Sequence, residues 1–154
     1  MKQLFFVLVF CLYGMVCSGA AEQDFVAADQ ALRDELVQRM ETDQAVRRTV
    51  MEQGDSPDSD VLEKMVAIDR DNTAWLKRII AEKGWPTISL VGDDGASAAW
   101  LLVQHADADP DFQAQVLSLM EASVAKQEAS PGNFALLTDR VLSAQGKPQR
   151  YGTQ

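Results

Sequence analysis

The segment Gln104-His105-Ala106-Asp107 holds the only histidine of the chain. Imidazole is the side chain best suited to proton transfer near neutral pH, so His105 is the first candidate for a general acid or base. Asp107 could fix the orientation of the ring from two residues away. A lone histidine near the apolar end of a helix is also a common core residue, and the segment alone leaves both interpretations open.

Polar side chains interrupt the apolar stripes of three predicted helices. Positions 32, 36, 40, 43, 47 and 50 share one face, which places Asp43 and Arg47 on it, four residues apart. Positions 62, 65, 69, 72, 76 and 79 share another face, which includes Asp69 and Asn72. His105 continues the stripe of the third helix. Because burying an unpaired charge costs several kcal/mol, we expect these groups to meet.

Each of these side chains also has a simpler interpretation. Asp43 and Arg47 could form a plain salt bridge along one helix, worth about 0.3–0.5 kcal/mol if it is exposed. Asp69 and Asn72 could lie at the edge of the core, in contact with water. Only the positions of the helices in space decide between a shared site and separate surface groups.

The alternation of Asp107, Asp109 and Asp111 is similar to that of a calcium-binding loop, but the similarity is incomplete. Phe112 stands where such a loop needs a glycine, and Ser118 stands where it needs a bidentate glutamate. The sequence therefore assigns no metal and no other cofactor. A divalent metal ion held by His105 with two or three aspartates remains the alternative.

The elements that must position these residues are five stretches with apolar residues at helical spacing. They predict an all-α bundle of about five helices with short connections and a non-helical C-terminal tail. We expect Ser56 and Asp109 to cap the second and fourth helices, each before a proline. Thr87 to Val91 is expected to be extended. The predicted helices cover residues 24–52, 57–82, 96–106, 110–127 and 133–145.

Residues 1–20 have the pattern of a signal peptide, which would leave residues 21–154 as a single helical domain. Lys2 precedes an apolar run up to Cys17, and small residues follow, so cleavage is expected after Ala20 or Ala21. The run of about 14 residues would span only ~21 Å as a helix, so we expect no permanent membrane span. Lipidation at Cys17 is a minor alternative to cleavage. The expected location is periplasmic or secreted.

Charge and cysteine content exclude several classes of function. The net charge is −9 without a basic stripe, which disfavours nucleic acid as a partner. Both cysteines, Cys11 and Cys17, lie in the expected signal peptide, so the mature domain would have no thiol chemistry. The chain has no Gly-rich phosphate loop, no Rossmann fingerprint and no Gly-x-Ser-x-Gly elbow.

In its ordered set of short motifs the chain resembles a bacterial domain-of-unknown-function family. The motifs span nearly all of residues 21–154. The resemblance implies no chemistry, but it implies that the C-terminal Tyr-Gly-Thr-Gln belongs to the domain. The motifs are Asp43-Gln44 with Arg47 or Arg48, Asp69, Gly84-Trp85-Pro86, Gln104-His105-x-Asp107, Asp139-Arg140 and Gln149-x-Tyr151-Gly152-Thr153-Gln154.

Together these patterns predict an exported helical protein that works as a hydrolase-like enzyme at a His/Asp/Arg site. His105 would be the acid or base, and Asp107 or Asp69 would orient it. Asp43 and Arg47 would complete the site, with Arg47 binding an anionic or carbonyl oxygen of the substrate. Gln104 and Tyr151 would supply neutral hydrogen bonds.

The alternative is a non-catalytic binding module of the cell envelope with a buried polar network. Its partner would be a peptide, a glycan or an envelope protein, whereas the enzyme would act on an unknown small molecule. An open cleft beside the polar residues favours the enzyme, and a sealed cluster favours the binding module.

Overall fold

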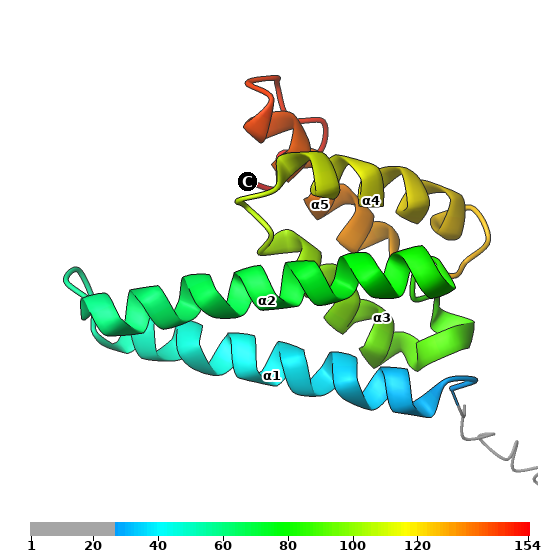
Figure 1. Cartoon of the computed structure of the whole chain (residues 1–154). Helices are drawn as coiled ribbons and strands as arrows, with labels where there is room; N and C mark the ends of the chain where they lie inside the picture. Colours follow the sequence, from blue (N-terminus) through cyan, green and yellow to red (C-terminus); the bar gives the residue numbers. More distant parts are fainter. Residues whose placement is uncertain (1–26) are drawn as a thin grey trace, which may run out of the picture.

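The computed structural model describes residues 27–154, and within them all regular structure is helical (Figure 1). The all-α prediction is therefore confirmed for this part of the chain. The expected signal peptide at residues 1–20 lies outside the described residues. No helix in residues 27–154 is long and apolar enough to cross a membrane. The helices are α1 (Gln30–Glu52), α2 (Ser59–Lys83), α3 (Ile88–Gln104), α4 (Pro110–Val124) and α5 (Pro131–Ala144).

Two helical hairpins and one central helix make up the bundle. The long helices α1 and α2 lie side by side, and α4 and α5 form the second hairpin, as Figure 1 shows. The start of α3 is attached to the start of α1, because Asp29 donates its backbone N–H to the carbonyl of Leu90 at 2.8 Å. From there α3 follows α1 and ends beside Asp43. The far ends of α1 and α2 extend past the other helices.

The predicted helix starts are confirmed at one of two positions. Asp109 caps α4, since its carboxylate accepts the N–H of Phe112 at 3.1 Å, with Pro110 as the first helical residue. The expected cap at Ser56 is wrong, because α2 begins at Ser59. The side chain of Gln53 binds the backbone N–H of Asp58 at 2.9 Å, which keeps the chain in the connecting loop as far as Asp58.

The largest difference from prediction is the start of α3. Residues 88–91 are helical rather than extended, and they place Val91 in the core with no exposed surface. Gly92 then leaves helical geometry with φ +76°, a value that favours glycine, so the helix is kinked there. Gly95 lies so close to Val91 that an added Cβ would stand 2.8 Å from the valine Cβ. The other helix bounds agree with expectation or differ by up to six residues; α1, for example, begins at Gln30 behind its cap Asp29.

One apolar core joins the five helices. Its largest fully buried side chains come from every helix, including Leu36 on α1, Leu76 on α2, Leu102 on α3, Met120 on α4 and Leu137 on α5. Trp85, of the Gly84-Trp85-Pro86 motif, is buried in the connection between α2 and α3. Such burial is the main source of folding free energy.

The chain after α5 is non-helical, and the buried carboxylate of Asp139 holds it in place. This carboxylate accepts the backbone N–H groups of Arg150, Tyr151 and Thr153 at 2.6–3.1 Å and the Thr153 hydroxyl at 3.0 Å. Burial opposes ionisation of Asp139, but the hydrogen bonds from Tyr151, Thr153 and Arg150 lower its pKa to about 2. The tail is therefore an anchored part of the domain.

Substitution of Asp139 by asparagine should release the tail. The amide presents one acceptor oxygen and turns an NH₂ donor towards the backbone N–H groups. We expect faster hydrogen exchange at the amides of Arg150, Tyr151 and Thr153, and the same release in the unsubstituted protein as the pH falls towards 2. The acid effect has this sign because the folded-state pKa lies below the ordinary value. Asp55→Asn, in an exposed turn, is the control; unchanged exchange at the three amides of Asp139→Asn would contradict the assignment.

Candidate functional site

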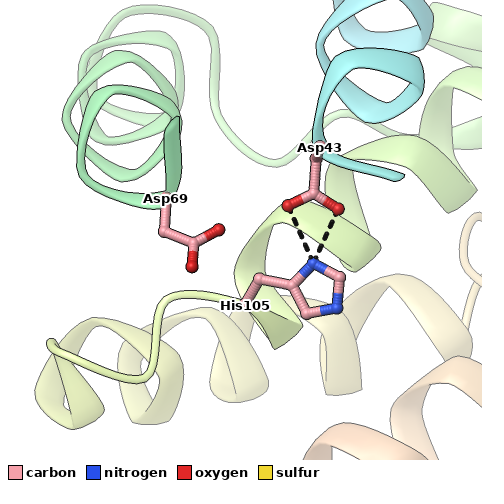
Figure 2. Close-up of side chains that lie close together, drawn as sticks. All are labelled: Asp43, Asp69 and His105. Atoms are coloured by element: carbon pink, nitrogen blue, oxygen red, sulfur yellow. Dashed lines mark hydrogen bonds and ion pairs between the residues drawn. The ribbon is translucent and has the colours of Figure 1, made fainter. Parts of the chain in front are cut away.

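Three of the predicted residues come together where α3 ends (Figure 2). Asp43 lies on α1, Asp69 on α2, and His105 directly follows α3. The Nδ1 atom of His105 lies 3.0 and 2.9 Å from the two carboxylate oxygens of Asp43. The Asp43 side chain has no exposed surface, whereas that of His105 keeps 16 % of its surface exposed. Periodicity thus predicted the faces correctly, although 62 residues separate Asp43 from His105.

Arg47 joins the two carboxylates. Its Nε donates to Asp43 at 3.2 and 3.3 Å, and one terminal nitrogen donates to Asp69 at 2.6 Å. The other terminal nitrogen lies 3.4 Å from the sulfur of Met65. The expected ion pair between Asp43 and Arg47 therefore exists, and it is part of a larger group. We call Asp43, Arg47, Asp69 and His105 the polar cluster.

The two carboxylates of the polar cluster are held in different ways. Burial disfavours the charged form of Asp43, but hydrogen bonds from His105 and Gln44 and the charge of Arg47 bring its pKa below the ordinary value. Burial also disfavours ionisation of Asp69, and the nearby charge of Asp43 adds to this effect. The pKa of Asp69 is raised in spite of Arg47. Asp43 is thus the stable anion of the cluster, and Asp69 is the carboxylate that protonates more easily.

The contact with Asp43 determines which ring nitrogen of His105 is free. A carboxylate only accepts hydrogen bonds, so Nδ1 carries the proton and Nε2 of the neutral ring has the lone pair. Nε2 has no hydrogen-bond partner among residues 27–154 and is not a buried atom. His105 also lines a cleft, so part of its ring is open to a water molecule or a ligand.

The cleft lies between α2 and the loop that joins α3 to α4, with a volume of about 490 Å³. This volume is in the range that holds a small organic molecule. Side chains at helical spacing on α2 form one wall, and the loop forms the other. The lining residues are Val66, Asp69, Arg70, Thr73, Ala74, Lys77 and 105–109.

The structure places Asp107 in the cleft but away from the histidine ring. Its carboxylate binds Arg140 of α5 at 2.9 Å and the amide of Gln113 at 3.3 Å. Gln113 is buried and also donates to the carbonyls of Val103 and Gln104 at 3.0 and 3.3 Å. Asp43 therefore has the orienting contact that was expected from Asp107 or Asp69, while Asp107 fixes the loop.

Gln104 and Tyr151 are not among the residues that line the cleft. Gln104 is buried at the end of α3, where its side-chain oxygen has no hydrogen-bond partner. Tyr151 is half exposed on the tail, next to Arg150. The predicted neutral hydrogen bonds from these two residues to a substrate do not fit this geometry. Arg47 does not fit its predicted role either. Its guanidinium is not free to bind a substrate oxygen, because both carboxylates of the polar cluster already bind it.

Asp43, Asp69 and His105 are also the residues that could hold a metal ion. Each offers one ligand atom, and these atoms lie within 4.8 Å of one another. One histidine and two carboxylates would suit a divalent cation such as zinc. In the geometry described here, however, the guanidinium of Arg47 binds both carboxylates, and Nδ1 faces Asp43. A metal ion would have to displace these contacts.

Reasoning from the sequence missed the rest of the α2 wall. Val66, Arg70, Thr73 and Lys77 continue the helical face of Asp69 at intervals of three and four residues, which is the signal that could have indicated them. Lys77 forms an ion pair with Asp109 across the cleft. Arg70 makes no ion pair among the described residues.

Comparisons with known proteins show a family and no function. A model described as a family of unknown function (DUF6624) matches residues 30–154. The match covers the polar cluster, the cleft and the C-terminal tail, and the expected kind of family is confirmed. No curated protein and no solved structure matches the chain.

Replacing Arg47 by glutamine should destabilise the fold in a pH-dependent way. Two carboxylates would then face each other without a cation, and breaking a buried ion pair costs about 3–5 kcal/mol. The pKa of Asp69 is already raised, and loss of the Arg47 charge would raise it further. The loss of stability should therefore be greater at pH 7.5 than at pH 5, because a lower pH favours the protonated form of Asp69. Urea denaturation at both pH values measures this difference.

The matched control is Arg48→Gln, next along α1 on an exposed position. It should change the free energy of unfolding little at either pH. An equal loss for Arg47→Gln at pH 5 and pH 7.5 would disprove the proposed charge balance.

Proposed function

The chain belongs to the DUF6624 family, and from the geometry of its cleft we propose that it is a hydrolase-like enzyme with His105 as the general base. The proposal rests on the different surroundings of the two ring nitrogens of His105. Nδ1 faces the buried carboxylate of Asp43, whereas Nε2 has no hydrogen-bond partner among residues 27–154, and the residue lines the cleft. An oriented histidine with one free nitrogen is the usual arrangement for proton transfer.

The polar cluster suits the charge changes of such a step. With a neutral ring, its formal charge is −1, from two carboxylates and one guanidinium. When Nε2 takes a proton from water, the imidazolium makes the cluster neutral, and the adjacent Asp43 stabilises it. The water oxygen then bonds to the electrophilic carbon of the substrate. The leaving group takes the proton back from Nε2, so the ring returns to its starting form.

The partial burial of the ring supports catalysis over a purely structural role. A sealed polar network would have favoured the binding module, but His105 lines an open cleft. Asp43 is fully buried behind it, where water does not weaken its interaction with the ring. In this proposal His105 is the catalytic residue, Asp43 positions it, and Arg47 with Asp69 positions Asp43.

Removal of the imidazole should abolish turnover and leave the fold intact. We expect His105→Gln to lower the rate of hydrolysis of a small activated ester, such as p-nitrophenyl acetate, by roughly 10²–10⁴-fold. Asp43→Asn should also lower the rate. Arg78→Gln, on an exposed part of α2 away from the cleft, should not.

The tautomer offers an independent measurement, because His105 gives the only imidazole signals of the protein. ¹⁵N NMR of the neutral ring should show the proton on Nδ1. A proton on Nε2, or normal ester hydrolysis by a folded His105→Gln variant, would rule out His105 as the base.

The place of action in this proposal is outside the cytoplasm. It rests on the pattern of residues 1–20 in the sequence, not on the fold. When the full chain is expressed in a bacterium, the exported protein should begin at Ala21 or Glu22. Intact-mass measurement of the periplasmic fraction tests this. A chain that keeps residues 1–20 in the cytoplasmic fraction would contradict export, and a lipid-modified Cys17 would support the lipoprotein alternative.

A further inference from the structure

We propose that the substrate is a small molecule with an acidic group and an adjoining apolar part, and that Arg70 binds its acidic group. This inference rests on the proposed function, because it names the kind of molecule that would lie against His105. It also assigns to Arg70 the anion-binding role for which Arg47 is not free.

Two cationic side chains line the cleft, Arg70 and Lys77. Within residues 27–154, Lys77 has a carboxylate partner and Arg70 has none. Arg70 makes neither an ion pair nor a hydrogen bond within residues 27–154, although several acidic residues lie nearby. Those acids are already bound to other cations, in the pairs Asp69–Arg47, Asp109–Lys77 and Asp107–Arg140. A carboxylate or phosphate that enters the cleft would therefore meet one guanidinium with all its donors free.

The position of Arg70 suits a substrate that also reaches His105. Arg70 lies on the α2 wall, directly after Asp69 and one helical turn before Ala74, and His105 lies on the opposite wall. An anion held at Arg70 would thus present its neighbouring atoms to the space in front of the ring. Arginine suits this role because its planar fork can donate two parallel hydrogen bonds to a carboxylate or phosphate.

Most of the exposed surface in the cleft is apolar, although three aspartates also line it. Val66 and Ala74 on α2 face Ala106 and Ala108 in the loop, and Val66 is 61 % exposed. Covering exposed apolar surface with an apolar group is favourable because it removes that surface from water, so Val66 favours a ligand with an apolar part. These side chains leave room for a short apolar chain beside the anion. A volume of about 490 Å³ limits the bound part to a small molecule or the end of a larger one.

The test is a comparison of three probes with the same six-carbon chain. Hexanoate carries a carboxylate, hexyl phosphate carries a phosphate, and hexanol carries no charge. Each is titrated into the purified protein while the ring signals of His105 are followed by NMR. We expect both anions to shift these signals with saturation and hexanol to shift them far less. The anion with the lower dissociation constant shows which acidic group the site prefers.

Two variants distinguish Arg70 from the general surface charge. Arg70→Gln should weaken binding of the anions roughly tenfold or more, since hydrogen bonds between charged groups contribute strongly. Arg78→Gln, eight residues along α2 and outside the cleft, should leave binding unchanged. Equal affinity of Arg70→Gln and the unsubstituted protein for hexanoate and hexyl phosphate would overturn the assignment, as would equal shifts with hexanol.

The tautomer of His105 distinguishes a failure of this inference from a failure of the proposed function. Arg70 does not contact His105, so Arg70→Gln should keep the proton on Nδ1. If the Nδ1 tautomer is present and anions still bind independently of Arg70, the substrate class is wrong and the general base stands. If the proton is on Nε2, the proposed function fails whatever the anions do.

Discussion

The carboxylate of Asp43 is fully buried, and the rest of the site depends on the groups that keep it ionised there. Burial alone would favour its protonated form, so each partner has a physical task. His105 and Gln44 donate hydrogen bonds, and Arg47 supplies the opposite charge. Since Arg47 also binds Asp69, the carboxylate on α1 is linked both to α2 and to the residue that follows α3.

The polar cluster is an inefficient way to stabilise the fold. Replacing a buried ion pair with well-packed apolar residues is often neutral or stabilising, because the cost of removing charges from water disappears. The positions of Asp43 and Asp69 on otherwise apolar faces would accept leucine or methionine with little change in pattern. What an apolar core cannot do is orient an imidazole ring at a cleft. The proposed catalytic role would account for retaining these charges at positions where apolar residues would pack.

Periodicity predicted the helical class, the cap at Asp109 and the inward faces of Asp43, Arg47, Asp69 and His105. It could not predict which of these residues pair, because a repeat of 3.6 gives the face of a helix and not its neighbour in space. For the same reason Asp107, adjacent to His105 in sequence, was expected to orient the ring. The early start of α3 was missed because its first turn is separated from the rest by Gly92, which reads as a helix end. Asp139 belonged to one of the motifs, but periodicity could not predict its role, because most of its partners are backbone N–H groups of the tail.

The ends of α1 and α2 extend past the other helices. We therefore expect the side of the cleft nearer these ends to be more mobile than the other side. Towards its C-terminal end, α1 no longer has α3 alongside (Figure 1). Local unfolding starts where few apolar contacts hold a segment, so fraying should begin at the loop between the two helices and proceed towards the polar cluster. Val66 belongs to this looser part of α2, whereas the link from Asp69 to Arg47 holds the next turn. In the proposed enzyme, the outer rim of the cleft would therefore open more readily than the polar cluster, which its ion pairs hold in place.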